Sequence, residues 1–248
     1  MKKRKNKNKI VQSAIVFGAI LISFLLILIG YKINNRFLLQ INQDKVSEEE
    51  YCEVMKLVEY DTKVEIQQKY DCDYTDDFWE KKYNGKYGYE ILTENTIEEL
   101  KRIYAVYEVA EENGDIKENG FAGLEKRWKK ENHNREEKIK NGEVVYGVKE
   151  YTFELYLQYE MSRLKEAYCN DKSREGMALT EEEILKHYNS HDWIYGENGD
   201  KADLETARIS VERELREKKY EEIVEQKAKN SKVGGEMKKI SRFTLKNI

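Results

Sequence analysis

The chain has 248 residues, 40% of them hydrophobic and 37% charged, a composition that excludes intrinsic disorder and allows one or two domains. Its net charge is −4, but residues 1–36 hold eight of the 44 basic side chains and no acidic one, so 36 basic residues face 48 acids in the rest. The resulting net charge of −12 excludes nucleic-acid binding by this acidic body, because neutralising phosphates requires clustered Lys and Arg.

The chain opens with a basic tail followed by a long apolar segment. Residues 1–9 carry six Lys and Arg side chains, and residues 10–31 carry no charge. At a rise of about 1.5 Å per residue, the apolar segment is long enough to cross a hydrocarbon core of roughly 30 Å. The alternative is a cleaved signal peptide, whose apolar core of roughly 7–15 residues would be shorter. The sequence therefore predicts an uncleaved transmembrane signal anchor over residues 10–31.

The distribution of basic residues also predicts an orientation. Six basic residues precede the apolar segment and only two follow it closely. Because the excess of Lys and Arg stays in the cytoplasm, the N-terminus is predicted inside and residues 37–248 outside. The prediction is a single-pass protein of the cell membrane with an extracytoplasmic domain, which excludes a cytosolic enzyme and ATP-driven chemistry.

The predicted extracytoplasmic body begins with a strand and continues in helices. The strand is expected over residues 38–46, with a turn or kink inside it. Ser47 and Glu50 then form a capping box, in which a hydroxyl and a carboxylate satisfy free backbone N–H groups at a helix start. Thr96 with Glu99 gives a second capping box and predicts a second helix start. The absence of proline favours long uninterrupted helices.

The second half of the body is also predicted to be helical. A third capping box, Thr180 with Glu183, opens a helix, and another long helix is expected over residues 204–229. The break between these two helices, residues 192–203, is polar and contains two glycines. It predicts a short linker.

The chain ends in a segment that suits a short strand or strands, with the apolar residues Val233, Ile240 and Phe243. An isolated strand would leave backbone N–H and C=O groups unpaired, so we expect the first and last strands to pair with each other. The predicted fold is mainly α, a helical domain closed by short N- and C-terminal β-strands.

Three segments resemble extracytoplasmic foldases of the SurA and PrsA type. "LLQINQDKVSEEEY" is similar to the opening of their chaperone domain, and "LTEEEILKHYNSH" to the segment before their parvulin-type isomerase domain. "RISVERELREKKYEEIVEQKAKNSKV" resembles the helix and strand that follow that domain. In PrsA-like proteins an isomerase domain lies between the last two segments, whereas residues 192–203 leave no room for one. The resemblance therefore implies a SurA N-domain-like chaperone without the parvulin domain.

This resemblance implies a membrane-anchored holdase that binds unfolded, newly exported polypeptides and has no prolyl isomerase activity. The alternative is a non-catalytic scaffold or accessory subunit for one dedicated membrane or cell-envelope partner. A secreted hydrolase is the third possibility, and it would need a pocket with convergent carboxylates or histidines. On the first two interpretations the protein is not an enzyme and needs no cofactor.

Tyrosine is abundant, with 18 residues, and its large apolar face and polar tip suit weak binding of extended chains. Tyr151, Tyr156 and Tyr159 follow one another at helical spacing and are the candidate peptide-binding residues. Aromatic residues at helical spacing more often belong to a core, so both interpretations stay open.

Histidine, acidic and cysteine residues give three further patterns. His187 and His191 are spaced i, i+4 and could share a metal, but no third ligand is evident and we predict no metal site. "DCDYTDD" lacks the glycine and distal glutamate of a calcium loop and is predicted to be a turn. The three cysteines are Cys52, Cys72 and Cys169; they read as small buried residues, with a Cys52–Cys72 disulfide as the alternative.

Overall fold

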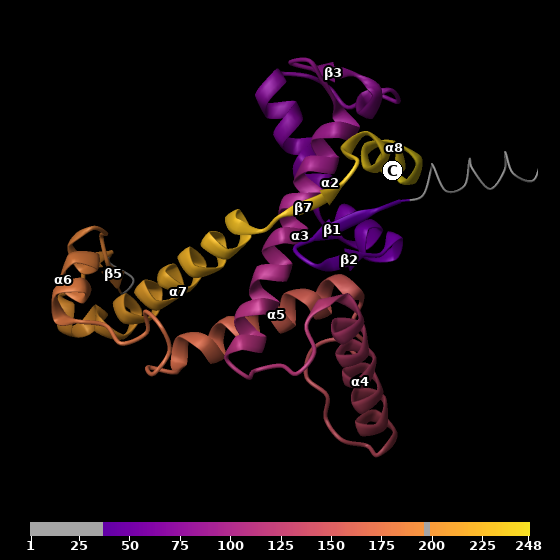
Figure 1. Cartoon of the computed structure of the whole chain (residues 1–248). Coiled ribbons are helices and arrows are strands. Elements are labelled where there is room, and N and C mark those ends of the chain that lie inside the picture. The colour runs from indigo at the N-terminus through magenta and orange to yellow at the C-terminus, as the bar shows by residue number, and fades with distance from the viewer. Residues whose placement is uncertain (1–36, 196–198) are drawn as a thin grey trace, which may run out of the picture.

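A computed structural model describes residues 37–195 and 199–248. The molecule is elongated, with three arms that extend from a central helical core (Figure 1). The elements in chain order are β1 (Leu39–Ile41), β2 (Asp44–Val46), α2 (Glu48–Tyr70), a 3₁₀ turn η1 (Phe78–Glu80), β3 (Lys82–Tyr83), β4 (Lys86–Tyr87), α3 (Gly88–Glu112), α4 (Gly120–Lys140), α5 (Phe153–Asn170), α6 (Glu181–Asn189), β5 (Ile194–Tyr195), β6 (Asp200–Lys201), α7 (Leu204–Asn230), β7 (Val233–Gly235) and α8 (Met237–Asn247).

Helix α3 is the centre of the molecule, since α2, α5, α7 and α8 all pack against it. It buries side chains around much of its circumference, including Leu92, Leu100, Val106 and Tyr107. The predicted capping box of Ser47 and Glu50 opens α2, and that prediction is confirmed. The mainly helical architecture is also as predicted.

The predicted pairing of the first and last strands is confirmed. β1 lies in the middle of a three-stranded antiparallel sheet, with β2 on one side and β7 on the other. Leu39 stands opposite Gly235, and Ile41 opposite Val233. A glycine is required at position 235, because φ is +130° and a Cβ there would collide with the carbonyl oxygen of Leu38. The sheet therefore ties the two ends of the described body together.

The start of helix α3 differs from the sequence prediction. Helix α3 begins at Gly88 rather than near Thr96, and Glu90 accepts a hydrogen bond from the backbone N–H of Tyr87 (2.8 Å). Thr96 lies inside the helix, where its hydroxyl donates to the carbonyl oxygen of Leu92 (2.7 Å). A hydroxyl at a helix start and a hydroxyl that bonds the preceding turn have the same sequence signature, so the pattern misplaced this boundary.

The C-terminal segment is a strand followed by a helix, not strands alone. Ile240 and Phe243 belong to α8, and Ile240 is fully buried. Inside this helix, the hydroxyl of Thr244 lies 2.5 Å from the hydroxyl of Tyr51 on α2. The apolar positions are spaced three residues apart and fit one face of a helix, which docks on α2 and α3.

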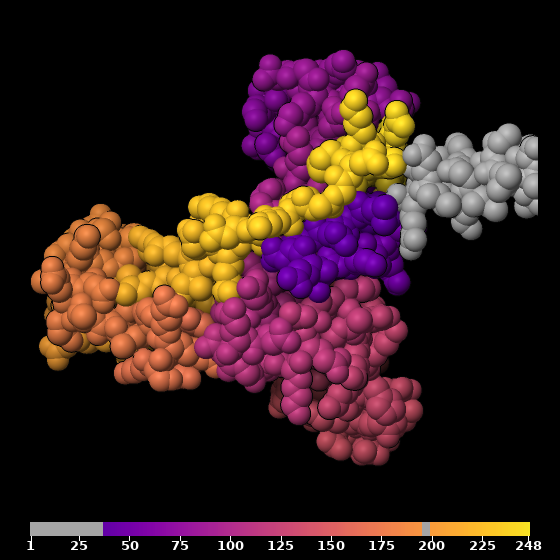
Figure 2. All heavy atoms as spheres, in the orientation of Figure 1, coloured from indigo at the N-terminus to yellow at the C-terminus, as the bar shows by residue number. Residues whose placement is uncertain are grey.

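The arm formed by α6, β5, β6 and the first half of α7 is a separate lobe (Figures 1 and 2). It has its own small core of buried residues, Ile184, Trp193, Ala202, Ala207 and Val211. The segment predicted to be a polar linker contributes two of them, and a backbone hydrogen bond joins the N–H of Ala202 to the carbonyl of Trp193 (2.7 Å). A short hairpin, not an unstructured linker, therefore closes this lobe, which we call the distal lobe.

The membrane predictions need correction. In the part of the chain that the structure describes, no helix is both long and apolar enough to cross a membrane. The predicted span, residues 10–31, and the basic tail, residues 1–9, lie outside that part. The structure therefore does not support the transmembrane helix in the predicted fold class, the membrane as a binding partner or the single-pass localisation.

Candidate partner-binding surfaces

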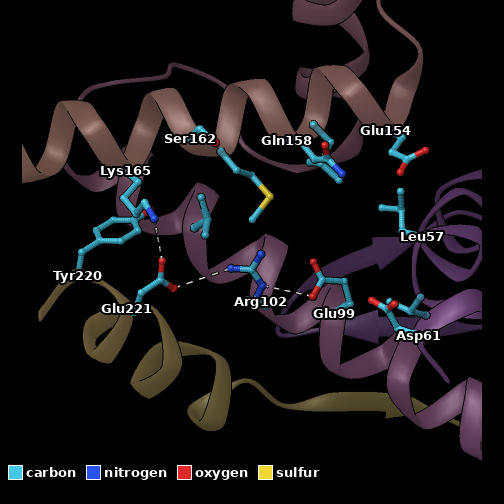
Figure 3. A pocket seen from close by; sticks show the side chains of 14 residues that line it. Leu57, Asp61, Glu99, Arg102, Glu154, Gln158, Ser162, Lys165, Tyr220 and Glu221 are labelled. Atoms are coloured by element: carbon cyan, nitrogen blue, oxygen red, sulfur yellow. Dashed lines mark hydrogen bonds and ion pairs between the residues drawn. The ribbon is translucent and has the colours of Figure 1, made fainter. Parts of the chain in front are cut away.

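A cleft of about 360 Å³ opens where α2, α3, α5 and α7 meet (Figure 3). Helix α5 lines it with residues three or four positions apart, which lie on one helical face. The floor is apolar, and the residues that form it are Leu57, Val58, Val106, Leu157, Met161 and Tyr220. The cleft is therefore an apolar groove that runs along one face of α5.

The rim of the cleft is charged. Its side chains include four acidic residues, Asp61, Glu99, Glu154 and Glu221, and two basic residues, Arg102 and Lys165. Ion pairs run around it from Glu99 to Arg102 (3.2 Å), on to Glu221 (3.9 Å) and then to Lys165 (3.5 Å) (Figure 3). Because the side chains of these pairs are partly exposed to solvent, each pair adds little to stability. They present charges of both signs to any molecule that enters the cleft.

The three candidate tyrosines lie together, at the start of α5 and just before it. The rings of Tyr151 and Tyr159 are stacked with centroids 5.4 Å apart, and Tyr156 lies 6.0 Å from Tyr151. Tyr156 is buried, whereas Tyr159 is 42% exposed and Tyr151 is half-buried. Tyr156 therefore belongs to the core, and Tyr151 with Tyr159 offers an aromatic pair at the surface.

A buried carboxylate fixes this part of α5. Glu160 receives a two-pronged hydrogen bond from the Arg127 guanidinium, with Nε at 2.7 Å and Nη2 at 3.0 Å. The hydroxyls of Tyr107 and Tyr156 also donate to it, at 2.7 and 3.0 Å. Burial and the adjacent Glu160 charge raise the pKa of both tyrosines. Every group in this network has a partner, so its role is to hold α3, α4 and α5 together.

The segment between α4 and α5 displays apolar side chains to solvent. Val144 is 72% exposed and Tyr146 is 86% exposed. The Arg135 guanidinium holds the backbone here, since it donates to the carbonyl oxygens of Tyr146 (2.7 Å) and Val148 (3.0 Å). Arg135 also lies over the ring of Tyr151, 4.6 Å from its centroid. This display segment, residues 144–148, therefore presents apolar groups on a backbone that is tied down. Four of its five residues are apolar, and nothing in that pattern predicts their exposure.

The remaining sequence candidates have these places in the structure. "DCDYTDD" forms a turn in which Asp77 accepts a hydrogen bond from the hydroxyl of Thr75 (2.8 Å), as predicted. All three cysteines are free, so the alternative of a Cys52–Cys72 disulfide is wrong. His187 and His191 lie in the distal lobe, beside an acidic residue of α7 that the sequence did not single out.

Comparison with known proteins gives one extensive match. No protein-family model matches the chain. The chaperone for lacto-N-biosidase of Bifidobacterium longum subsp. longum is 30% identical over 183 residues. The match covers 74% of this chain and 65% of that protein, so the chain spans less than two thirds of the length of its relative.

Two crystal structures of the GH136 lacto-N-biosidase from Eubacterium ramulus show a weaker likeness. The native protein and its selenomethionine derivative both give a TM-score of 0.46, with 20% and 21% identity. Each comparison covers 59% of this chain and 30% or 29% of the enzyme. At these TM-scores the likeness supports no argument about fold or function.

The match corrects the resemblance drawn from the sequence. The similarity that extends over most of this chain leads to a glycosidase chaperone and not to SurA- or PrsA-type foldases, so that assignment and the link to general protein export are wrong. The relative is named as a chaperone and not as an enzyme, which confirms the prediction of a non-catalytic protein. The chain is similar to an accessory protein of a glycosidase.

Proposed function

We propose that this protein is a non-catalytic chaperone or accessory protein dedicated to one glycosidase, for which a lacto-N-biosidase is the first candidate. The observation that carries the proposal is the 183-residue match to the chaperone for lacto-N-biosidase. The alternative drawn from the sequence, an accessory protein with one partner, fits this match better than a general holdase does.

The chemistry of the cleft supports a dedicated partner. A promiscuous chaperone needs an adaptable apolar surface, because its clients share little except exposed apolar side chains. Here the apolar floor is framed by charges of both signs at fixed positions. Fixed charges favour a segment with complementary charges and penalise one without them. An amphipathic helix with an apolar face and flanking charges fits such a groove.

The second contact surface in the proposal is the display segment with the Tyr151–Tyr159 pair beside it. Exposed apolar side chains on a fixed backbone lose little conformational freedom on binding. The entropy cost therefore offsets less of the free energy gained by burying them. Tyr146 would contribute most, since it is the largest of these side chains and 86% exposed. The peptide-binding role predicted for Tyr151 and Tyr159 becomes, in this proposal, contact with the folding glycosidase.

The test is co-expression of the candidate lacto-N-biosidase with and without this protein. We expect the yield of active enzyme to fall at least ~10-fold without it, because unassisted chains aggregate before they fold. Aggregation suppression of several unrelated unfolded proteins, measured in parallel, should be weak. Equal enzyme yield in both cultures, or equal protection of unrelated proteins, would contradict a dedicated chaperone.

Two surface variants and two matched controls localise the interaction. Arg102→Glu reverses a charge on the cleft rim, and Tyr146→Ser removes the most exposed aromatic ring of the display segment. Arg242→Glu on α8 and Ile209→Ser on α7 make similar changes at exposed positions away from both surfaces. The first pair should lower the yield of active enzyme and the control pair should not. The same loss in all four variants would argue against these surfaces.

A further inference from the structure

The distal lobe brings three metal-ligand side chains together. His187 lies in the last turn of α6, His191 follows two residues after the end of this helix, and Glu214 faces them from α7. One ligand atom from each residue lies within 4.8 Å of the other two. The oxygen Oε1 of Glu214 is 3.2 Å from Nε2 of His187 and 3.7 Å from Nε2 of His191. Two imidazoles and one carboxylate are a ligand set typical of zinc.

The Nε2 atom of the buried histidine has no hydrogen-bond partner. His187 is 6% exposed, and its Nε2 is a buried polar atom without a hydrogen bond in the described part of the chain. Although Glu214 Oε1 is only 3.2 Å away, the angle does not allow a hydrogen bond. A buried ring nitrogen that has a carboxylate oxygen close by and no hydrogen bond is a candidate metal ligand. A buried nitrogen left unpaired is costly, so the cluster lacks a partner at this position.

The second histidine is already oriented for binding. Nδ1 of His191 lies 2.9 Å from the hydroxyl of Ser190 and 3.4 Å from the carbonyl oxygen of His187. A carbonyl that accepts from Nδ1–H fixes the tautomer in which Nε2 carries a lone pair. That Nε2 is the atom on the side of Glu214. Trp193, whose ring centroid lies 6.0 Å from both imidazoles, covers the pair with an apolar surface.

We infer that His187, His191 and Glu214 form a zinc site. Zinc holds nitrogen and oxygen ligands at about 2.0–2.1 Å in a tetrahedron, which places two ligand atoms roughly 3.3 Å apart. The two separations of 3.2 and 3.7 Å to the carboxylate oxygen are close to this value, and the three ligand atoms, which lie within 4.8 Å of one another, would draw together around the ion. Three protein ligands leave the fourth position for a water molecule. The sequence did not reveal this site, because the third ligand, Glu214, comes from another helix.

The site has a structural consequence within the distal lobe. The core of this lobe has only five buried apolar residues, and α6 and α7 are its two helices. A metal held by both helices would link them beside that core. Because zinc binds the assembled ligands and not the separated ones, it stabilises the folded lobe. This inference does not depend on the proposed function, since neither partner-binding surface includes the three ligands.

The test is titration of the full, metal-free chain with zinc, followed by calorimetry, together with cobalt(II) absorption as a report of tetrahedral coordination. We expect one equivalent of zinc to bind and to raise the melting temperature. His191→Ala and Glu214→Gln change exposed ligands, so the lobe should still fold, which far-UV circular dichroism checks. Each should weaken zinc binding at least ~10-fold and abolish the melting shift.

His133→Ala and Glu222→Gln are the matched controls, because both residues are exposed and lie outside the cluster. They should bind zinc as the unaltered chain does. Three results would overturn the inference: no zinc binding by the unaltered chain at micromolar concentrations, undiminished binding by both ligand variants, or thiolate-to-cobalt charge-transfer bands that place the metal on the free cysteines.

Discussion

Glu50 gives a prediction about how stability depends on pH. Its side chain is 4% exposed, and burial raises the pKa of the carboxyl from 4.5 to about 7, against the opposing hydrogen bonds from Tyr104 and the backbone N–H of Ser47. An acid with a raised folded-state pKa favours folding in its protonated form. Its contribution is therefore fully present below pH 4.5 and is lost as the pH rises through about 7. At about 1.4 kcal/mol per pH unit, the loss amounts to roughly 3 kcal/mol.

The variant that isolates this effect is Glu50→Gln. Glutamine keeps an oxygen that can accept the N–H of Ser47 and removes the buried charge. Chemical denaturation at a series of pH values gives the free energy of unfolding for both proteins. The variant should gain about 2.5 kcal/mol relative to the unaltered chain between pH 5 and pH 8, because most of the Glu50 titration falls in that window.

Glu49→Gln is the matched control, since Glu49 is the exposed neighbour on the same helix turn. Its stability relative to the unaltered chain should change far less over the same range. If the difference between Glu50→Gln and the unaltered chain is constant from pH 5 to pH 8, then Glu50 is ionised in the folded state without penalty. The assignment of a raised pKa to burial would then be refuted.

Three further changes test other parts of the fold. Arg127→Ala leaves the buried Glu160 carboxylate without its cation and should cost about 3 kcal/mol by chemical denaturation, whereas a loss below 1 kcal/mol would show that the pair is not structurally important. Gly235→Ala places a Cβ against the carbonyl oxygen of Leu38 and should cost more than ~1 kcal/mol, with faster amide exchange in β1; unchanged exchange would contradict the strand register. Thr180→Ala removes the side-chain cap of α6 and should lower stability by about 1 kcal/mol, and no change would mean that this helix end is held by other contacts.

Local signals in the sequence predicted the parts of the fold that local chemistry decides. The capping boxes at Ser47 and Thr180 mark real helix starts. In each, a hydroxyl and a carboxylate three residues apart accept hydrogen bonds from the free backbone N–H groups of the first turn. Thr96 carries the same pattern in the middle of α3, where it bonds the preceding turn. What decided this helix start was Glu90, which caps Tyr87 although no Ser or Thr precedes it. The spacing of Thr and Glu alone could not distinguish a capping hydroxyl from one that bonds the preceding turn inside a helix.

Long-range chemistry explains what the sequence missed. The pairing of β1 with β7 was predictable, because an isolated strand leaves its backbone groups unpaired and a second strand was expected at the end of the chain. Glu214 was not predictable as a ligand, since it is one of many acids along α7 and only the packing of α6 on α7 selects it. The cleft rim has the same origin: Arg102 and Glu221 are ordinary charged residues until α3 and α7 bring them to one opening.

The arrangement of the arms bears on why a dedicated partner fits this protein better than a general client. The cleft lies where four helices meet at the centre, whereas the display segment lies between α4 and α5 in another arm (Figure 1). A short unfolded segment can occupy one such surface without reaching the other. Its affinity would then come from that one surface alone. A folding domain can contact both at once, and the second contact then forms at a high effective concentration. Two separate surfaces on one molecule therefore favour a partner that can contact both.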